Sequence, residues 1–456
     1  VTALCLVVCT GAIVESKAHV HATISLLATE QPAYAAVAGS AGASAEPRAL
    51  VIPLWPGDSA WTSLYQHYVS LYRIRMLNGY SPVVKKSYKT EVSDRFSSCN
   101  KGVLTDDHVE ALQAMKIGYV LLHEDAFPEK VSPLPVAFTL KNLLNHPRLE
   151  LVKQSGPVWA FRLLDQPRQP DPEAQDWTVF FPARRHEFER GCDKSMVTRT
   201  SHGVSGSGFA TLSDAGQTLV TKGTHMVATT NLKWLVRAAG EGVLSVKHLF
   251  DGEVGHETVL ALNDDAWAWH EIPVQGLHGY AKTALALSLV RGESIDLDSA
   301  MLMAGDWRMP APGESLTLPA ALFFHAGATD LQSGAVVFKR LRDHAAFDNH
   351  DKEAVSEIRR NKGVVLYGPR LPLPPGAYRV TLIASSSAPD RTTLGSFHVK
   401  QGRDILGFDY VYVGGGNWID IQITNELPVS VNLLYSGEGD AVIEKVTFSR
   451  EGPDAE

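Results

Sequence analysis

The chain has 456 residues, of which 45% are hydrophobic and 20% charged, a balance typical of folded globular protein. Its net charge of -8 and its lack of any block of like charges argue against a nucleic-acid partner and a polybasic membrane patch. At about 150 residues per domain, this length predicts three domains.

The first 15 residues are apolar up to Glu15 and carry no other charge. Because a bilayer core needs roughly 20 apolar residues to cross, this run indicates the last part of a membrane helix. A signal-peptide core is the alternative, since Val20-His21-Ala22 is a passable cleavage site. Both interpretations predict an extracytoplasmic location, periplasmic or at the cell surface, and the first adds membrane anchoring. No later apolar run is long enough to span.

Residues 16–47 are predicted to hold one helix, Ile24–Ala38, followed by a flexible GSAGASAEP linker. Residues 48–164 then alternate strand and helix. Ala49–Leu54 and Gly118–His123 are continuous apolar runs, as expected of buried strands. Helices are expected at Ala60–Tyr72, from Thr105, and at about Val136–Asn145, before a closing hairpin over Leu149–Leu164. This order predicts a small α/β domain with a parallel or mixed sheet.

Two all-β regions follow a proline-rich linker, DQPRQPDP, at Asp165–Pro172. Residues 173–308 and 315–450 both show short apolar strands separated by Gly and Asp, at the spacing typical of β-sandwiches. The predicted fold is therefore multi-domain: a truncated membrane helix, a small α/β domain and two all-β, jelly-roll-like sandwiches.

Part of the α/β region has a familiar arrangement of residues. It comprises Val51-Ile52-Pro53-Leu54, Gly57-Asp58-Ser59 with Trp61, Asn78-Gly79-Tyr80-Ser81, and Gly118–His123. The stretch resembles the extracytoplasmic C-terminal region of bacterial multi-pass membrane glycosyltransferases that use lipid-phosphate sugars. The resemblance covers about a quarter of the chain. It implies membrane attachment and a cell-envelope glycan setting, with the catalytic loops of such enzymes lying before residue 1.

A second resemblance lies in the last β region. Gly363–Arg370 is followed by Leu373-Pro-Pro-Gly-Ala-Tyr-Arg-Val380, in which Pro-Gly makes a turn and Tyr378 and Val380 share one face of the next strand. The pattern is similar to jelly-roll domains of the carbohydrate-binding type.

One set of polar side chains is expected to converge at the carboxyl ends of the α/β strands, where open α/β sheets bind ligands. The set comprises Asp58, Trp61, Asn78, Tyr80 and His123. The alternative is structural, with Asp58 as a helix N-cap and His123 held by backbone. No motif for a catalytic nucleophile or a nucleotide is present, so no catalytic residue is assigned.

A metal site and a disulfide are further hypotheses. Asp251, Glu253 and His256 surround a turn and could hold a structural calcium, although an acidic hairpin turn explains them equally. No other cofactor is expected. Cys99 and Cys192 could pair in an oxidising compartment or remain free thiols.

Aromatic residues in the β regions indicate sugar binding. Trp267 and Trp269 alternate on a strand after Asp264 and Asp265, and sugar rings stack on aromatic faces beside carboxylates that bind hydroxyl groups. Two Trp residues on one face also suit a sandwich core. Asn417 and Trp418 follow a glycine run that would let a loop approach a ligand.

Together these patterns predict a non-catalytic extracytoplasmic region of a membrane protein that acts on cell-envelope glycans. Its partners would be a glycan or the membrane-embedded part of the same protein. The alternatives are a secreted carbohydrate-binding or carbohydrate-active protein and a structural envelope protein without a ligand.

Overall fold

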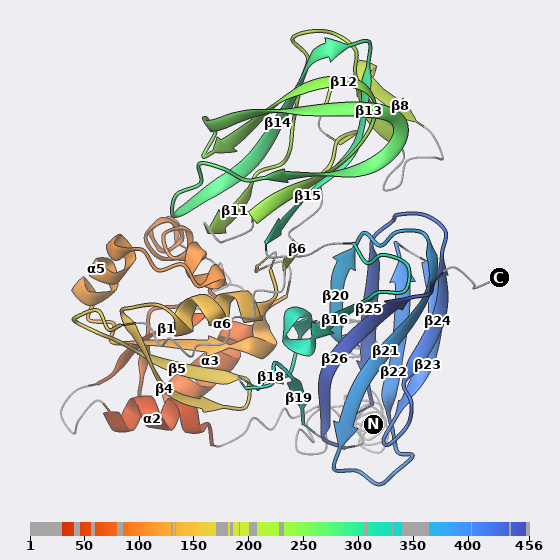
Figure 1. Cartoon of the computed structure of the whole chain (residues 1–456). Coiled ribbons are helices and arrows are strands. Elements are labelled where there is room, and N and C mark those ends of the chain that lie inside the picture. The colour runs from red at the N-terminus through yellow and green to blue at the C-terminus, as the bar shows by residue number, and fades with distance from the viewer. Residues whose placement is uncertain are drawn as a thin grey trace, which may run out of the picture.

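The computed structural model describes residues 30–40, 46–55, 60–79, 85–128, 131–132, 134–169, 181–182, 186–190, 192–199, 208–227, 232–304, 309–330, 332–339, 364–402, 404–436 and 439–452. Three units are visible in Figure 1: an α/β unit, a first β unit and a second β unit. The predicted membrane helix over residues 1–15 lies outside the described residues. Within the described part, no helix is both long enough and apolar enough to cross a bilayer.

The α/β unit contains one mixed five-stranded sheet, as predicted. Its order is β2-β1-β3-β5-β4, with β1 parallel to β2 and β3 and with β5 antiparallel to β3 and β4. The elements are α2 (Pro32–Ser40), β1 (Arg48–Ile52), α3 (Ala60–Leu71), β2 (Arg75–Met76), α4 (Lys86–Tyr88), a π turn (Lys89–Asp94), a 3-10 turn (Ser97–Lys101), α5 (Asp106–Ala114), β3 (Tyr119–His123), a 3-10 turn (Glu124–Ala126), α6 (Val136–Leu144), β4 (Leu149–Ser155) and β5 (Val158–Leu163).

Both faces of this sheet are covered, which explains the continuous apolar runs of β1 and β3. Leu50 and Val120 pack into a core that includes α5 and α6 residues. Their neighbours Val51 and Leu121 point the other way, into a second core with tyrosines of α2 and α3. Strand alternation therefore assigns each β1 and β3 residue to one of two buried layers.

The first β unit is one continuous ten-stranded sheet. Its strands are β6 (Phe181–Pro182), β7 (His186–Glu187), β8 (Val197–Arg199), β9 (Gly208–Leu212), β10 (Thr218–Val220), β11 (Thr224–Val227), β12 (Leu232–Phe250), β13 (Glu253–Pro273), β14 (Tyr280–Gly292) and β15 (Ile295–Ala304), with a 3-10 turn at Lys194–Met196. The all-β character is as predicted. The prediction of short strands is wrong for β12 and β13, which have 19 and 21 residues.

A bulge allows β12 to stay continuous where the sequence indicates a break. Beyond Ala238, Gly240 takes a positive φ of 120° and the register with β13 shifts. The first half of β12 pairs with β15 and the second half with β14, both on the edge opposite β13. The glycine therefore bends a long strand rather than ending it.

The second β unit is a two-sheet sandwich, as predicted. One sheet has the order β18-β19-β26-β21-β24 with β16 beside β26, and the other has the order β17-β20-β25-β22-β23. Its elements are β16 (Ser315–Pro319), a 3-10 turn (Ala320–Leu322), β17 (Phe324–His325), β18 (Ala328–Thr329), β19 (Val336–Phe338), β20 (Val364–Leu371), β21 (Gly376–Ser386), β22 (Thr393–Gln401), β23 (Asp404–Tyr412), β24 (Trp418–Ile423), β25 (Val429–Tyr435) and β26 (Ala441–Arg450).

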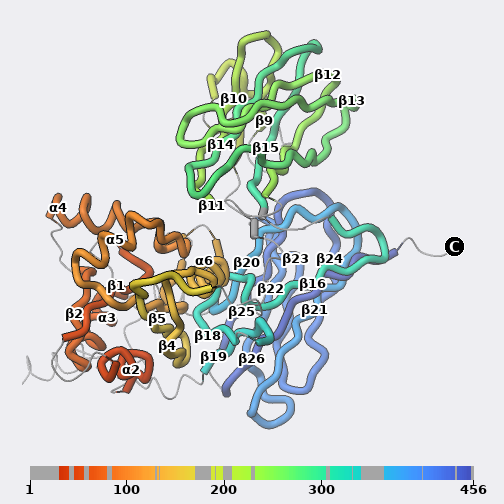
Figure 2. The backbone as a smooth tube through the Cα atoms, turned by 60° about the vertical axis from the view of Figure 1, so that its left-hand side comes forward, coloured from red at the N-terminus to blue at the C-terminus, as the bar shows by residue number. Residues whose placement is uncertain are grey.

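Polar contacts join the three units in pairs. Lys101 Nζ lies 3.3 Å from the hydroxyl of Tyr280, linking the α/β unit to the first β unit. Gln154 Nε2 donates to the Thr329 carbonyl at 2.8 Å, linking the α/β unit to the second β unit. Arg237 Nε donates to Glu426 at 2.8 Å, linking the two β units. In Figure 2, as in Figure 1, β18 and β19 lie on the side of the second sandwich that faces the α/β unit.

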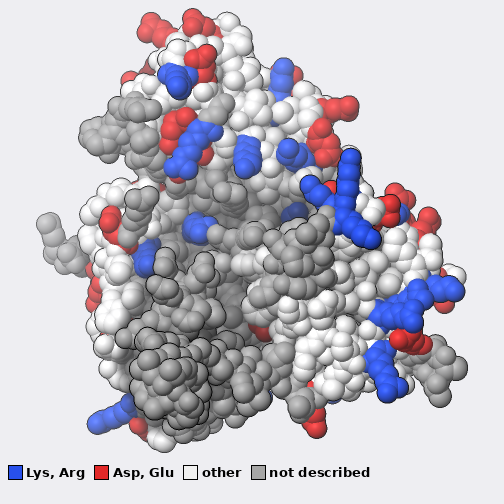
Figure 3. Space-filling model, turned by 180° about the vertical axis from the view of Figure 1, so that it is seen from behind, with Lys and Arg blue, Asp and Glu red and all other residues white. Residues whose placement is uncertain are grey.

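Charged side chains are mixed on the face of the molecule shown in Figure 3. Lys and Arg residues are interspersed with Asp and Glu there, and neither sign gathers into one large patch. The described residues of that face therefore offer no large patch of one sign to a highly charged partner.

Candidate functional site

His123 ends β3 at the carboxyl edge of the parallel strands, the position predicted for a site. Its Nε2 atom lies 2.8 Å from the hydroxyl of Tyr34, and its ring centroid is 4.7 Å from that of Tyr65. Its Nδ1 atom lies 3.9 Å from Asp125. Burial lowers the pKa of His123 to about 3 and raises the pKa of Asp125 to about 7. The imidazole is therefore neutral at pH 7.

This cluster is closed to ligands in the described structure. His123 is 1% exposed, and Tyr34 and Tyr65 are fully buried. Their hydrogen bonds satisfy polar groups inside the second core. The cluster thus packs α2 and α3 onto the sheet.

Two of the other residues predicted to join His123, Asn78 and Trp61, lie in the described part of the chain. Asn78 is buried and its side chain bonds both the N–H and the carbonyl of Val51, so it continues the sheet edge of β1. Trp61 is half-buried on α3. Asp58 and Tyr80 lie outside the described residues. The Asn78 amide therefore supports the backbone of β1, and the predicted convergence of these residues on a ligand stays a prediction.

Glu124 has a role that the sequence did not suggest. It is fully buried and accepts hydrogen bonds from the backbone N–H of Thr329 at 3.0 Å, the Thr329 hydroxyl at 2.6 Å and the Trp159 indole. His325 Nε2 lies 3.9 Å away. Burial raises the pKa of Glu124 to about 8, and the hydrogen bonds oppose that rise. Glu124 therefore joins the α/β unit to β18 of the second sandwich.

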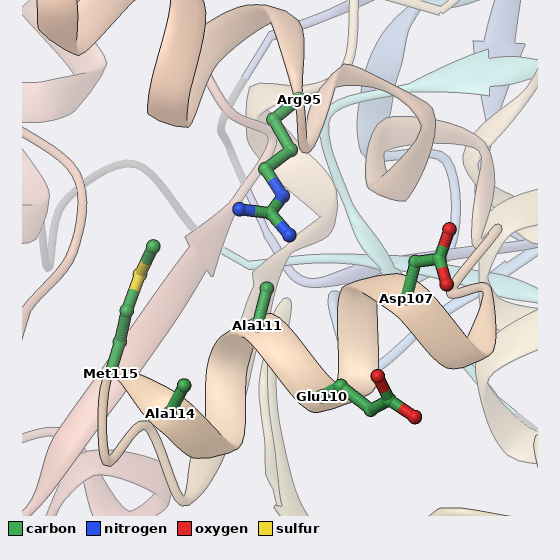
Figure 4. Close-up of a pocket in the computed structure, with 6 residues that line it drawn as sticks. All are labelled: Arg95, Asp107, Glu110, Ala111, Ala114 and Met115. Atoms are coloured by element: carbon green, nitrogen blue, oxygen red, sulfur yellow. The ribbon is translucent and has the colours of Figure 1, made fainter.

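A surface pocket of about 460 Å³ lies along α5. Its lining residues are Arg95, Asp107, Glu110, Ala111, Ala114 and Met115. Figure 4 shows Arg95 reaching over the helix, with Asp107 and Glu110 on the next turns of α5. The lining mixes one cation with two carboxylates and small apolar groups. It contains no nucleophile–base pair, so it does not define a reaction.

The predicted Trp267–Trp269 platform lies beside the contact between the two β units. The Arg237 guanidinium covers the Trp267 ring at 4.9 Å, and the Phe209 ring meets it edge-on at 5.3 Å. Trp269 packs against the core and its Nε1 atom is buried. Neither ring is thus the open platform expected from the sequence. Their sugar-binding role stays a prediction.

The acidic residues around β13 shape its backbone. Asp264 Oδ1 accepts a hydrogen bond from the N–H of Ala266 in the bulge, and Asp265 is exposed. Asp251 has a φ of 53° in the β12–β13 turn, and its carboxylate accepts from the N–H of Lys282. This supports the hairpin-turn alternative.

The calcium hypothesis for Asp251, Glu253 and His256 finds no support in the geometry. Throughout the described part of the chain, no three His, Cys, Asp or Glu side chains are grouped to hold a metal ion. The disulfide hypothesis also fails, since Cys99 is a buried free thiol and Cys192 a partly buried one.

Among the described residues, a line of exposed aromatic rings on β23 is the most open functional candidate. Phe408, Tyr410 and Tyr412 occupy alternate positions and are 49%, 49% and 38% exposed, whereas Val411 between them is buried. Ring centroids are 5.2 Å apart for Phe408–Tyr410 and 6.2 Å for Tyr410–Tyr412. We call these three residues the ring ladder. His398 on β22 meets Phe408 edge-on at 4.8 Å.

The sequence contains a local signal for the ring ladder in the spacing of its three aromatic residues. Three aromatic residues at i, i+2 and i+4 of a predicted strand must share one face. The edge position of β23 follows only from the sheet order. An edge strand leaves its outward rings without a neighbour on one side.

Asn417 and Trp418 have different roles. Asn417 is buried, and its side chain bonds the N–H and the carbonyl of Tyr412, fixing the turn into β24. Trp418 is 44% exposed on the outer face of the other sheet. Trp418 is thus accessible to a ligand, whereas the Asn417 side chain is buried and already hydrogen-bonded to the Tyr412 backbone.

Comparison with known proteins gives structural likeness without a family. No protein-family model matches the chain, and no curated protein matches its sequence. The chain is similar to the carbohydrate-binding module CBM36 in complex with calcium and xylotriose, with a TM-score of 0.20 and 12% identity over 26% of this chain and 98% of that one. It is similar to CBM35 from Paenibacillus barcinonensis, with a TM-score of 0.21 and 16% identity over 26% of this chain and 98% of that one.

A third solved structure is the Podospora anserina GH26-CBM35 β-(1,4)-mannanase, with a TM-score of 0.21 and 17% identity over 30% of each chain. At these TM-scores the likeness supports no functional conclusion. A function has to be inferred from the surface residues of this chain.

Proposed function

We propose that this chain binds glycans and that the ring ladder on β23 is its binding surface. The observation that carries the proposal is the exposure of Phe408, Tyr410 and Tyr412 on one side of an edge strand, opposite the side that carries the buried Val411. Contiguous exposed aromatic surface on a folded domain marks an interaction site.

The spacing of the rings suits an extended sugar chain. The ring centroids are 5.2 Å apart for Phe408–Tyr410 and 6.2 Å apart for Tyr410–Tyr412, which is comparable with the length of one sugar unit in an extended polysaccharide. The ring planes are inclined by 75° for Phe408–Tyr410 and by 53° for Tyr410–Tyr412. A sugar unit would therefore stack on one ring face at a time, as aromatic side chains combine an apolar face with a polar tip.

Polar side chains lie beside the rings for the sugar hydroxyl groups. Register places Ser396 opposite Tyr410, His398 opposite Phe408 and Asn432 opposite His398, so all of these point outward with the ladder. Ser396 Oγ lies 3.3 Å from His398 Nε2. Burial, followed by the charge of Lys400, lowers the pKa of His398 and keeps its ring neutral at pH 7.

The test is electrophoresis in gels that contain soluble neutral polysaccharides. We expect the wild-type chain to be retarded by at least one of the β-1,4-linked glucan, xylan and mannan gels. Tyr410→Ala should weaken that binding roughly two- to tenfold, from about 0.5–1.5 kcal/mol per ring contact. Val254→Ala, an exposed residue of the first β unit, is the matched control and should migrate as wild type.

Unretarded wild-type protein in every gel would overturn the proposal, as would a Tyr410→Ala protein that binds like wild type. The cell-envelope setting and the membrane anchor stay predictions from the sequence.

A further inference from the structure

The second sandwich carries another exposed aromatic residue on its opposite side. Trp418 lies on β24, where it alternates with buried Ile419 and Ile421 and therefore points away from the core. The strand β24 belongs to one sheet and β23 to the other. Because both sheets turn their buried residues toward the interior of the sandwich, Trp418 and the ring ladder face opposite directions.

The Trp418 ring is held in place by a planar ion pair. The Arg379 guanidinium lies 4.3 Å from the ring centroid. Its Nε donates to Asp420 Oδ1 at 2.8 Å and its Nη2 to Asp420 Oδ2 at 3.0 Å. This fork-to-fork pair fixes the guanidinium plane against the indole and leaves no net charge.

Rows of hydroxyl groups extend from this cluster across the sheet. Thr381 is in register with Trp418 on one side and Thr447 on the other, and Thr447 Oγ1 lies 3.0 Å from Thr317 Oγ1. A second row runs from Arg379 to Ser449, whose hydroxyl accepts from Ser315 at 2.8 Å. We call Trp418, Asp420, Arg379 and these hydroxyl residues the Trp418 face.

We propose that the Trp418 face is a second glycan-binding surface, distinct from the ring ladder, and that its ligand is an uncharged sugar chain. The proposal rests on the proposed function above. The indole offers a stacking surface, and the hydroxyl rows together with the Arg379–Asp420 pair offer donors and acceptors without net charge. A carboxylated sugar would have to displace Asp420 from Arg379 and then lie against the freed carboxylate.

Two surfaces on opposite faces give the second sandwich two ligands per chain. The test is isothermal titration calorimetry with hexasaccharides of β-1,4-linked glucose, xylose and mannose. We expect the wild-type chain to bind two equivalents of at least one of them. Trp418→Ala should bind one equivalent, at the ring ladder. The double variant Phe408→Ala/Tyr410→Ala should also bind one equivalent, at the Trp418 face.

Matched controls separate loss of a site from loss of folding. Val259→Ala removes an exposed residue of β13 and should keep two equivalents. Arg379→Ala keeps the indole but loses its support, so one of the two affinities should fall while the other is unchanged. Melting temperatures of all the variants should stay near that of wild type, since each altered side chain is on the surface.

The outcomes distinguish the two proposals. If wild type binds one equivalent and the double variant Phe408→Ala/Tyr410→Ala binds none, the proposal of a second surface is wrong. The proposed function at the ring ladder then still holds. Two equivalents in Trp418→Ala overturn the second surface as well. No binding of any hexasaccharide or polysaccharide by wild type overturns both proposals.

Discussion

The hydrogen bond between Tyr34 and His123 lies where water has no access. Its two atoms are 2.8 Å apart in a fully buried environment. Tyr34→Phe removes the hydroxyl and leaves His123 Nε2 without its tyrosine partner. Such an unmade buried bond costs about 1–3 kcal/mol. Urea unfolding of the variant should show that loss in the free energy of unfolding.

Tyr119→Phe is the matched control for this change. Tyr119 also loses a hydroxyl bond, to Ser40 at 2.8 Å, but that bond is only partly buried. Its loss should therefore be smaller, because water can take the place of the phenol beside Ser40. Equal losses in the two variants would contradict the buried role assigned to the Tyr34 bond.

Residue-level prediction from the sequence succeeded where a position follows from one element. His123 was placed at the carboxyl end of a buried strand because the apolar run before it ends there. Its partners Tyr34 and Tyr65 were not found, since they come from two helices whose docking depends on tertiary packing. Asn78 was assigned to a ligand although its amide binds the backbone of β1. Sequence patterns do not distinguish these two uses of an amide.

At the scale of elements, Gly240 decides the course of β12. A side chain there would place its Cβ 2.8 Å from the Ser294 carbonyl oxygen, at a φ of 120° that favours glycine. Gly240→Ala should therefore destabilise the protein by about 1–3 kcal/mol from backbone strain alone, with the carbonyl clash in addition. Thermal unfolding followed by circular dichroism measures the change.

Gly216→Ala is the control, because its φ of 103° is also positive but nothing lies within 4 Å of the added Cβ. The difference between the two variants isolates the clash. If both lose the same stability, close approach of the β14–β15 connection does not determine the bend.

The elements were predictable to different degrees for physical reasons. Strands of the α/β unit and of the second sandwich end at Pro, Gly or Asp turns, so local sequence defines them. In β12 and β13, glycine and aspartate occur inside bulges, where the same residues mark a bend and not an end. The edge position of β23, and with it the openness of the ring ladder, depends on long-range pairing that one sequence does not encode locally.

At the scale of the whole molecule, Glu124 couples the α/β unit to the second sandwich through a carboxyl group that titrates near neutrality. Its pKa is raised from 4.5 to about 8, so its contribution to stability is complete below about pH 4.5 and is lost as the pH rises through 8. We expect the wild-type melting temperature to fall between pH 6.5 and 8.5.

Glu124→Gln keeps the size of the side chain and removes its ionisation. Its melting temperature should fall less over the same pH range, and the difference at pH 8.5 should correspond to a few kcal/mol at most. The raised pKa of Asp125 acts in the same direction in both proteins. Parallel pH profiles for the two proteins would show that Glu124 is already ionised in the folded state at pH 6.5, so that its pKa is not raised by burial.

The pairwise contacts Lys101–Tyr280, Glu124–Thr329 and Arg237–Glu426 close a ring of three units. In a linear string of domains, one broken interface frees everything beyond it. In a closed ring, the two units on either side of a broken contact are still tethered through the third. The orientation of the sandwich that carries the exposed rings is therefore fixed by more than one interface. A mutation in a single interface should leave that orientation almost unchanged.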